Sequence, residues 1–143
     1  MSDIAADTGT RTEVTRAVVE KFYRLAMAGD GRALLEQCVH QDIVVEEPSY
    51  LPHAGTHRGS TAFASEVLAS AANLIELRSL RIEHIVADGD RAAAIVHARV
   101  LESDDEIIIA EHWLVADGKL AGLRVYIHDP APVLARMRVL QGA

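Results

Sequence analysis

The stretch DEIIIAEHWLVADGKLAGLRVYIHD, residues 105–129, constrains the fold of this chain more than any other segment. Its two arms are rich in Ile, Val, Leu, Trp and Tyr, the residue types that suit a pleated, half-buried surface. The arms meet at Asp117 and Gly118, a pair that is typical of tight hairpin turns. The stretch therefore predicts two antiparallel strands.

Carboxylates interrupt the apolar faces of this predicted hairpin. Side chains alternate between the two faces of a strand, so every second residue shares a face. One face of each arm contains a carboxylate, and the residues of these faces are Ile107, Ile109, Glu111 and Trp113 on the first arm and Leu123, Val125, Ile127 and Asp129 on the second. A buried carboxylate is costly unless it is paired, protonated or exposed to a cavity. We therefore expect a curved sheet that lines a pocket.

The size and charge of the chain exclude several classes of function. Its 143 residues, half of them hydrophobic, are enough for one folded domain with a core. The net charge of -7 argues against a nucleic-acid partner, and no apolar run is long enough to cross a membrane. Cys38 is the only cysteine, which excludes an internal disulfide and favours a cytoplasmic location. No metal-ligand spacing and no dinucleotide or phosphate motif occurs, so we expect no metal and no cofactor.

Sequence periodicity divides the chain into a tail and a single domain. Residues 1–11 are polar and acidic, which predicts a flexible N-terminal tail before one domain over residues 12–143. The expected elements of that domain are helices 12–27 and 32–39, a strand 42–47, a loop 49–59, a helix 60–70, strands 74–86 and 91–102, the hairpin, and a short helix after Pro130. The uneven apolar pattern of residues 74–86 indicates a bulge.

This order of elements predicts an α+β domain. Three N-terminal helices would pack on a strongly curved, mostly antiparallel sheet that forms a cone. Small residues on the concave face, such as Ala94 and Ala98, would leave room for a ligand inside the cone.

Four segments carry a family resemblance. They are AMAGD (26–30), DIVVEEPSYLPHAGTHRG (42–59), GDR (89–91) and AEHWLVADGKLAGLRVYIHDP (110–130). In this order they resemble the ketosteroid-isomerase-like, SnoaL-like superfamily, whose fold also includes scytalone dehydratase and nuclear transport factor 2. The resemblance covers residues 12–135 and implies the same cone, a cystatin-like α+β barrel. Because this fold hosts many activities, function depends on the residues of the pocket.

The resemblance implies roles for three carboxylates. Glu47, in the sequence VEEP (45–48), stands where steroid isomerases have their general base, and Glu111 stands where they have the acid that donates to the enolate oxygen. Asp129 resembles the acid/base residue of the SnoaL-like polyketide cyclases. From the residues alone, Glu47 could also be a charged strand end, and Glu111 could form a salt bridge with Arg91, Arg99 or Arg124.

Eight further residues are expected to contact a substrate: Phe22, Tyr23, Tyr50, His57, Phe63, Val96, Trp113 and Ile127. Steroid isomerases have a tyrosine on the first helix, and the corresponding residue here is Phe22, with Tyr23 beside it. They have another tyrosine on the third helix, and the corresponding position here lies near Val67. His53 and His57 lie on the predicted loop 49–59. Either could reach the substrate, although a position on the surface is the common place for a loop histidine.

Together these features predict a small cofactor-free enzyme that binds an apolar ketone or polyketide and cyclises or isomerises it by carboxylate acid/base chemistry. The missing phenols favour a polyketide-type cyclase over a steroid isomerase. The alternatives are a dehydratase or epoxide hydrolase in the same cone, and a non-catalytic ligand-binding or dimerisation module. We also expect a homodimer through the outer sheet face, which would carry Ile95, His97, Arg99, His112, Tyr126 and His128.

Overall fold

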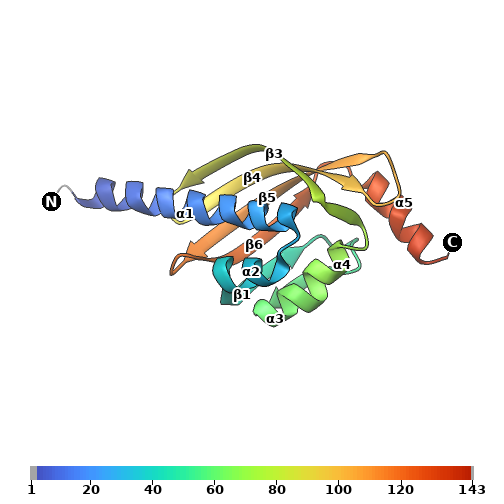
Figure 1. The fold of residues 1–143 in the computed structure, drawn as a ribbon, viewed down its shortest axis with the longest axis horizontal. Helices are drawn as coiled ribbons and strands as arrows, with labels where there is room; N and C mark the ends of the chain where they lie inside the picture. Colours follow the sequence, from blue (N-terminus) through green and yellow to red (C-terminus); the bar gives the residue numbers. More distant parts are fainter. Residues whose placement is uncertain (1–2, 143) are drawn as a thin grey trace.

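Helices cover one face of a curled sheet in the computed structural model, which describes residues 3–142 (Figure 1). The helical elements are α1 (Asp3–Ala28), α2 (Gly31–Cys38), α3 (Ser60–Ala62), a π-helix η1 (Phe63–Leu68), α4 (Ala69–Ala71) and α5 (Ala131–Leu140). The strands are β1 (Val39–Glu47), β2 (Gly55–Arg58), β3 (Ile75–Asp88), β4 (Arg91–Val100), β5 (Glu106–Ala116) and β6 (Lys119–Ile127). The elements α3, η1 and α4 follow one another directly, so the helix expected over residues 60–70 is present as one stretch with a π-helical centre.

The six strands form one mixed sheet in the order β2-β1-β6-β5-β4-β3. Only β1 and β6 pair in parallel, and the other neighbours are antiparallel. The pairing of β3 with β4 shifts register twice, between Glu76 and Arg81 and between Ile82 and His84. Such bulges bend and twist a strand, which agrees with the bulge expected here. The predicted α+β cone, with helices on one face of a strongly curved sheet, is confirmed.

Two elements differ from the sequence-based expectation. Helix α1 begins at Asp3, so the segment from Asp3 to residue 11, expected as a tail, is helical, whereas the boundary of the domain at residue 12 stays a prediction. The expected loop 49–59 contains strand β2, whose four residues pair with Val44–Glu47 of β1. The sequence GTHR contains no pattern that indicates a strand. This short edge strand forms because β1 supplies the partners for its hydrogen bonds.

The concave face of β4 belongs to the core and leaves no room for a ligand. Its residues Ala92, Ala94, Val96, Ala98 and Val100 are all buried. Helix α1 packs across β3 and β4, and the small alanine side chains allow the helix to lie close to the sheet. The expectation that Ala94 and Ala98 leave room for a substrate is therefore wrong.

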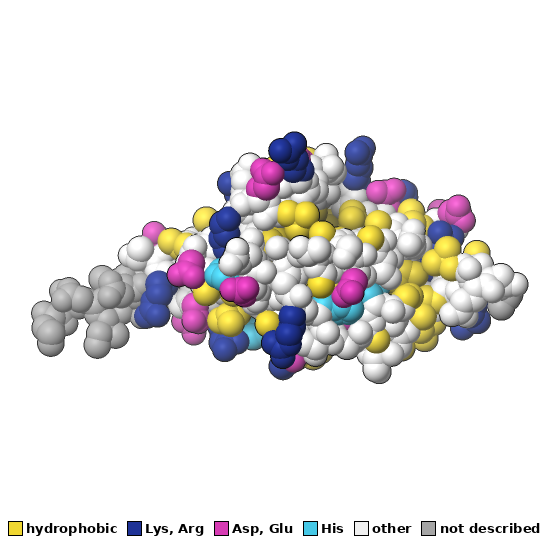
Figure 2. Space-filling view, turned by 90° about the horizontal axis from the view of Figure 1, so that it is seen from below, with side chains coloured by type: hydrophobic (Ala, Val, Ile, Leu, Met, Phe, Trp, Pro, Cys, Tyr) yellow, Lys and Arg dark blue, Asp and Glu magenta, His cyan; other side chains and the backbone are white. Residues whose placement is uncertain are grey.

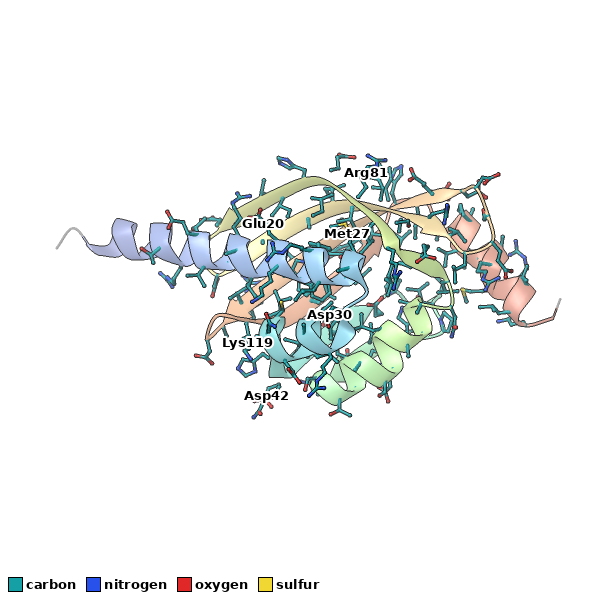
Figure 3. All side chains as sticks on the ribbon, viewed as in Figure 1. Glu20, Met27, Asp30, Asp42, Arg81 and Lys119 are labelled. Atoms are coloured by element: carbon teal, nitrogen blue, oxygen red, sulfur yellow. The ribbon has the colours of Figure 1, made fainter. Side chains whose placement is uncertain are left out.

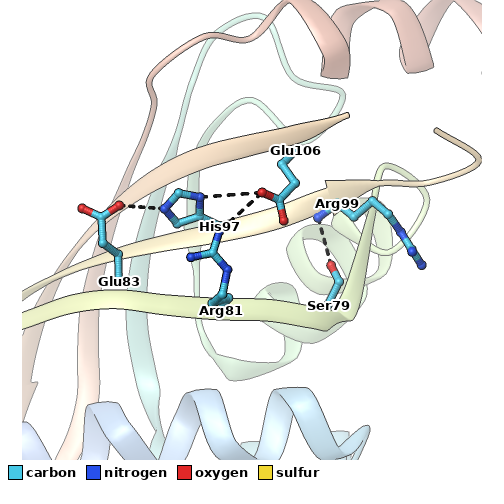
Figure 4. Close-up of polar contacts among 6 residues, drawn as sticks. All are labelled: Ser79, Arg81, Glu83, His97, Arg99 and Glu106. Carbon is cyan, nitrogen blue, oxygen red and sulfur yellow. Dashed lines mark hydrogen bonds and ion pairs between the residues drawn. The ribbon is translucent and has the colours of Figure 1, made fainter. Parts of the chain in front are cut away.

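The outer face of the sheet carries charged side chains (Figure 4). His97 lies between two carboxylates, with Nε2 2.7 Å from Glu83 and Nδ1 3.9 Å from Glu106, and Glu106 also contacts Arg81 at 3.4 Å. Tyr126 on the neighbouring strand β6 is 52% exposed. The face is thus polar with isolated apolar groups, and its proposed role as a dimer contact stays a prediction.

Candidate active site

A cavity of about 410 Å³ lies between helix α1, the helical stretch 60–71 and the concave side of the sheet. Its wall is mostly apolar, formed by residues that include Phe22, Phe63, Val67, Leu80, Ile107, Ile109, Leu123, Val125 and Ile127. In the view from below, hydrophobic side chains are exposed between Lys, Arg, Asp and Glu side chains (Figure 2). This volume and this lining are typical of a site for a small apolar molecule.

Glu111 places a carboxyl group on the wall of the cavity. It belongs to β5, between the buried Ile109 and Trp113 of the same face. Burial raises the pKa of Glu111 from 4.5 to about 7, the hydrogen bond from Tyr23 opposes this, and the charge of Glu47 adds to it. A carboxyl with such a pKa keeps its proton in a large fraction of molecules near neutral pH. Glu111 thus faces the cavity with a raised pKa, and the alternative salt bridge with Arg124 does not form, because Arg124 pairs with Glu46.

Two aromatic residues fix the position of Glu111. The hydroxyl of Tyr23 donates to Oε1 of Glu111 at 2.6 Å, and Nε1 of the fully buried Trp113 donates to the Tyr23 hydroxyl at 2.9 Å. Burial and the nearby Glu111 raise the pKa of Tyr23 well above 10.0, so the phenol keeps its proton. The chain of donors runs in one direction, from the indole to the phenol to the carboxyl group.

Glu47 is the second carboxylate of the cavity. Consecutive side chains of β1 point to opposite faces, so Glu46 points outward, where Arg124 donates to it, and Glu47 points inward. The Glu47 side chain is only 5% exposed, and its Oε1 lies 3.4 Å from Nε2 of His53. Strand β1 ends at Glu47, because the next residue, Pro48, cannot donate a backbone hydrogen bond.

His53 is a lining residue that the sequence-based interpretation placed on the surface. It is 7% exposed, and its Nδ1 lies 2.9 Å from Oγ of Ser70 on α4. The neighbouring His57 supports it, because His57 Nε2 lies 2.8 Å from the His53 carbonyl oxygen. The loop folds inward because Leu51 is buried and because β2 pairs with β1. In the sequence, the apolar Leu51 beside Pro52 is the signal that could have indicated this arrangement.

The structure brings together six of the eleven residues singled out in the sequence. Those that line the cavity are Phe22, Tyr23, Glu47, Phe63, Glu111 and Ile127. The other five, which do not line it, are Tyr50, His57, Val96, Trp113 and Asp129. Of these, Val96 and Trp113 are fully buried behind the wall. Burial raises the pKa of the half-buried Tyr50, and the charge of Glu47 raises it further.

Asp129 lies outside the cavity. Strand β6 ends at Ile127, so the two-residue alternation does not extend to Asp129. Its side chain is exposed and accepts a hydrogen bond from the backbone N–H of Ala131 at 3.1 Å, at the start of α5. Short acidic side chains favour this position before a helix, which gives Asp129 a structural task.

The described residues contain no group of three or more His, Cys, Asp or Glu side chains that could hold a metal ion. Among the helices of residues 3–142, none is long and apolar enough to span a membrane. Three glutamates line the cavity, Glu47, Glu76 and Glu111, and two of them form an interacting pair, because the charge of Glu47 helps to raise the pKa of Glu111. Such a pair can act as acid and base on one molecule.

Comparisons with known proteins agree with this architecture. The sequence pattern of the SnoaL-like domain matches residues 19–123. No curated protein matches the chain. An NTF2-like protein from Burkholderia xenovorans LB400 is similar in structure, with a TM-score of 0.67, 29% sequence identity, and coverage of 87% of this chain and 95% of that one.

Two further structural neighbours share the fold at lower identity. A protein described as a proposed ketosteroid isomerase from Kribbella flavida DSM 17836 has a TM-score of 0.61 and 20% identity, over 82% of this chain and 80% of that one. A protein described as a proposed polyketide cyclase from Sinorhizobium meliloti has a TM-score of 0.62 and 20% identity, over 77% of this chain and 94% of that one. The SnoaL-like pattern spans most of the sequence and the cone fold accompanies it, so the chain belongs to the SnoaL-like domain family.

Proposed function

We propose that this protein is a cofactor-free enzyme that moves a proton next to the carbonyl group of an apolar ketone. The observation that carries the proposal is the pair of carboxyl groups, Glu47 and Glu111, on the wall of one apolar cavity, with the pKa of Glu111 raised to about 7. A base and a hydrogen-bond donor on the same molecule are what enolisation requires.

In this mechanism the Glu47 carboxylate removes a proton from the carbon beside the carbonyl group. The electron pair of the broken C–H bond forms the C=C bond of an enolate, and the negative charge moves to the oxygen. Protonated Glu111 donates a hydrogen bond to that oxygen and stabilises the charge. Tyr23 and Trp113 hold Glu111 in place through their two hydrogen bonds.

The enolate then has two outcomes. Return of the proton from Glu47 to a different carbon isomerises a double bond. Attack of the enolate carbon on a second carbonyl group of the same molecule forms a C–C bond, closes a ring and leaves an alkoxide, which takes up the proton. We favour ring closure, because Tyr23 is the only phenol on the described wall and its hydroxyl already donates to Glu111. An apolar enclosure would also hold a flexible chain in a folded conformation.

The test is deuterium incorporation from D2O into the bicyclic ketone 2-decalone, followed by NMR. Glu47→Gln should slow exchange by about a hundred- to ten-thousand-fold, the usual contribution of a general base, because the change keeps the size and removes the basic charge. Asp129→Asn is the matched control and should exchange at the wild-type rate. Loss of exchange in Asp129→Asn with full exchange in Glu47→Gln would reverse the assignment of the base. Absence of any enzyme-dependent exchange would favour a ligand-binding module instead.

A further inference from the structure

Arg78 is the only Lys or Arg among the described residues that lines the cavity. It lies on β3 within the first register shift, between Glu76 and Arg81. Ser79 stabilises this irregular segment, because its Oγ donates to the carbonyl of Glu76 at 2.6 Å and accepts the N–H of Arg99 at 2.9 Å. Bulges redirect the side chains that follow them. Here the bulge accompanies a positively charged residue on a mostly apolar wall.

The Arg78 guanidinium reaches across to the turn between α1 and α2. This turn consists of Gly29 and Asp30, and Figure 3 labels Asp30 together with Met27 near the end of α1. A Cβ atom on Gly29 would lie 2.7 Å from Nη2 of Arg78, so a larger residue here would displace the guanidinium. Gly29 also has a φ of +73°, which favours glycine. Both residues line the cavity, and the guanidinium packs against Gly29 at this turn.

The guanidinium of Arg78 has no ion-pair or hydrogen-bond partner within residues 3–142. Four other arginines pair with glutamates, namely Arg32, Arg81, Arg124 and Arg136. The acidic lining residue nearest in sequence, Glu76, accepts the backbone N–H of Arg78 at 3.3 Å. A free guanidinium presents parallel N–H donors that match a carboxylate.

We propose that the substrate is a keto acid, whose carboxylate binds Arg78 at the rim while its ketone lies between Glu47 and Glu111. This inference rests on the proposed function, because it uses the same cavity and places the reacting carbonyl at the same carboxyl groups. The apolar wall between the two ends accommodates a hydrocarbon segment. A carboxylate fits better than a phosphate, because one guanidinium can satisfy a single negative charge through two parallel hydrogen bonds.

The test compares 9-oxodecanoate with its methyl ester, which keeps the ketone and the chain and removes the negative charge. Binding is measured by isothermal titration calorimetry to the full-length wild type and to Arg78→Gln. Wild type should bind the acid more tightly than the ester, and Arg78→Gln should weaken the acid about fivefold, or about 1 kcal/mol for an exposed ion pair. Its affinity for the ester should not change. Added salt should reduce the preference of the wild type for the acid.

Arg138→Gln is the matched control, since Arg138 is an exposed arginine on α5 that does not line the cavity. It should leave both affinities unchanged. Equal weakening of acid and ester in Arg78→Gln, an unchanged preference for the acid, or failure of wild type to bind the acid would each overturn the proposal. Because binding requires no turnover, a preserved preference for the acid without deuterium exchange would refute the proposed function and leave the role of Arg78 intact.

Discussion

Replacing Glu111 with Gln should stabilise the folded protein above neutral pH. The pKa of Glu111 is about 7 in the folded state, against 4.5 as the reference for an unfolded chain. Between these values the folded chain retains a proton that the unfolded chain has released, so the stability of the wild type falls as the pH rises. The loss is complete above the folded pKa and amounts to at most about 3 kcal/mol.

Gln avoids this loss because it has nearly the size of Glu and cannot ionise. Its side-chain oxygen can still accept the hydrogen bond that Tyr23 donates to Oε1 of Glu111. The variant should therefore match the wild type near pH 4.5 and exceed it progressively up to about pH 8. The same change should slow deuterium exchange, because the protonated carboxyl group that stabilises the enolate is lost.

Urea unfolding at several pH values between 5 and 8 measures the effect. All other titrating groups are common to both proteins and cancel in the difference between their free energies of unfolding. Glu20→Gln, at an exposed position on α1, is the control and should show no such trend. Parallel stability curves for wild type and Glu111→Gln across this range would refute the conclusion that Glu111 is held in a desolvated environment.

Three further predictions concern the support of the site and the assembly. Tyr23→Phe removes the donor to Glu111 and leaves the buried Trp113 N–H without its acceptor, so it should lower the free energy of unfolding in urea by about 1–3 kcal/mol. In the wild type this hydrogen bond from Tyr23 lowers the pKa of Glu111. The pKa of Glu111 in the variant should therefore be higher in an NMR titration. His53→Asn removes the imidazole beside the proposed base and should lower kcat for exchange more than it raises KM, whereas an equal effect on both would contradict a positioning role. Tyr126→Glu should convert a homodimer into a monomer in analytical ultracentrifugation, and a monomeric wild type at micromolar concentration would contradict the proposed dimer.

Local patterns in the sequence were sufficient to predict most of the fold. The alternation of β5 and β6 around Asp117 and Gly118 predicted the hairpin, because both its strands bury one face. Strand β2 could not be predicted, because GTHR contains no alternation and becomes a strand only by pairing with β1. The parallel pairing of β1 with β6 joins segments far apart in the chain, and local periodicity does not reveal such a pairing.

The site was only partly predictable, for related reasons. Glu111 was found because it interrupts a strand face that is otherwise apolar, and Glu47 was found through the family resemblance of the segment VEEP. His53 was missed because loops have no periodicity that indicates which side chains point inward. Asp129 was assigned to the pocket by extending an alternation past the end of β6, where the chain turns into α5. The position of the Arg78 side chain depends on a bulge. The sequence indicated that a bulge was present, but not toward which side it would turn this side chain.

The central claim is that Glu111 keeps its proton near neutral pH inside the cavity it shares with Glu47. An NMR titration of the protein with 13C-labelled glutamate carboxyl groups tests this claim directly, with Glu111→Gln used to assign the signal. The account predicts a carboxyl resonance that titrates at about pH 7 and is absent from the variant. A Glu111 resonance that titrates near the ordinary glutamate value of about 4.3 would contradict the claim, since Glu111 would then be ionised at neutral pH and could not donate to an enolate.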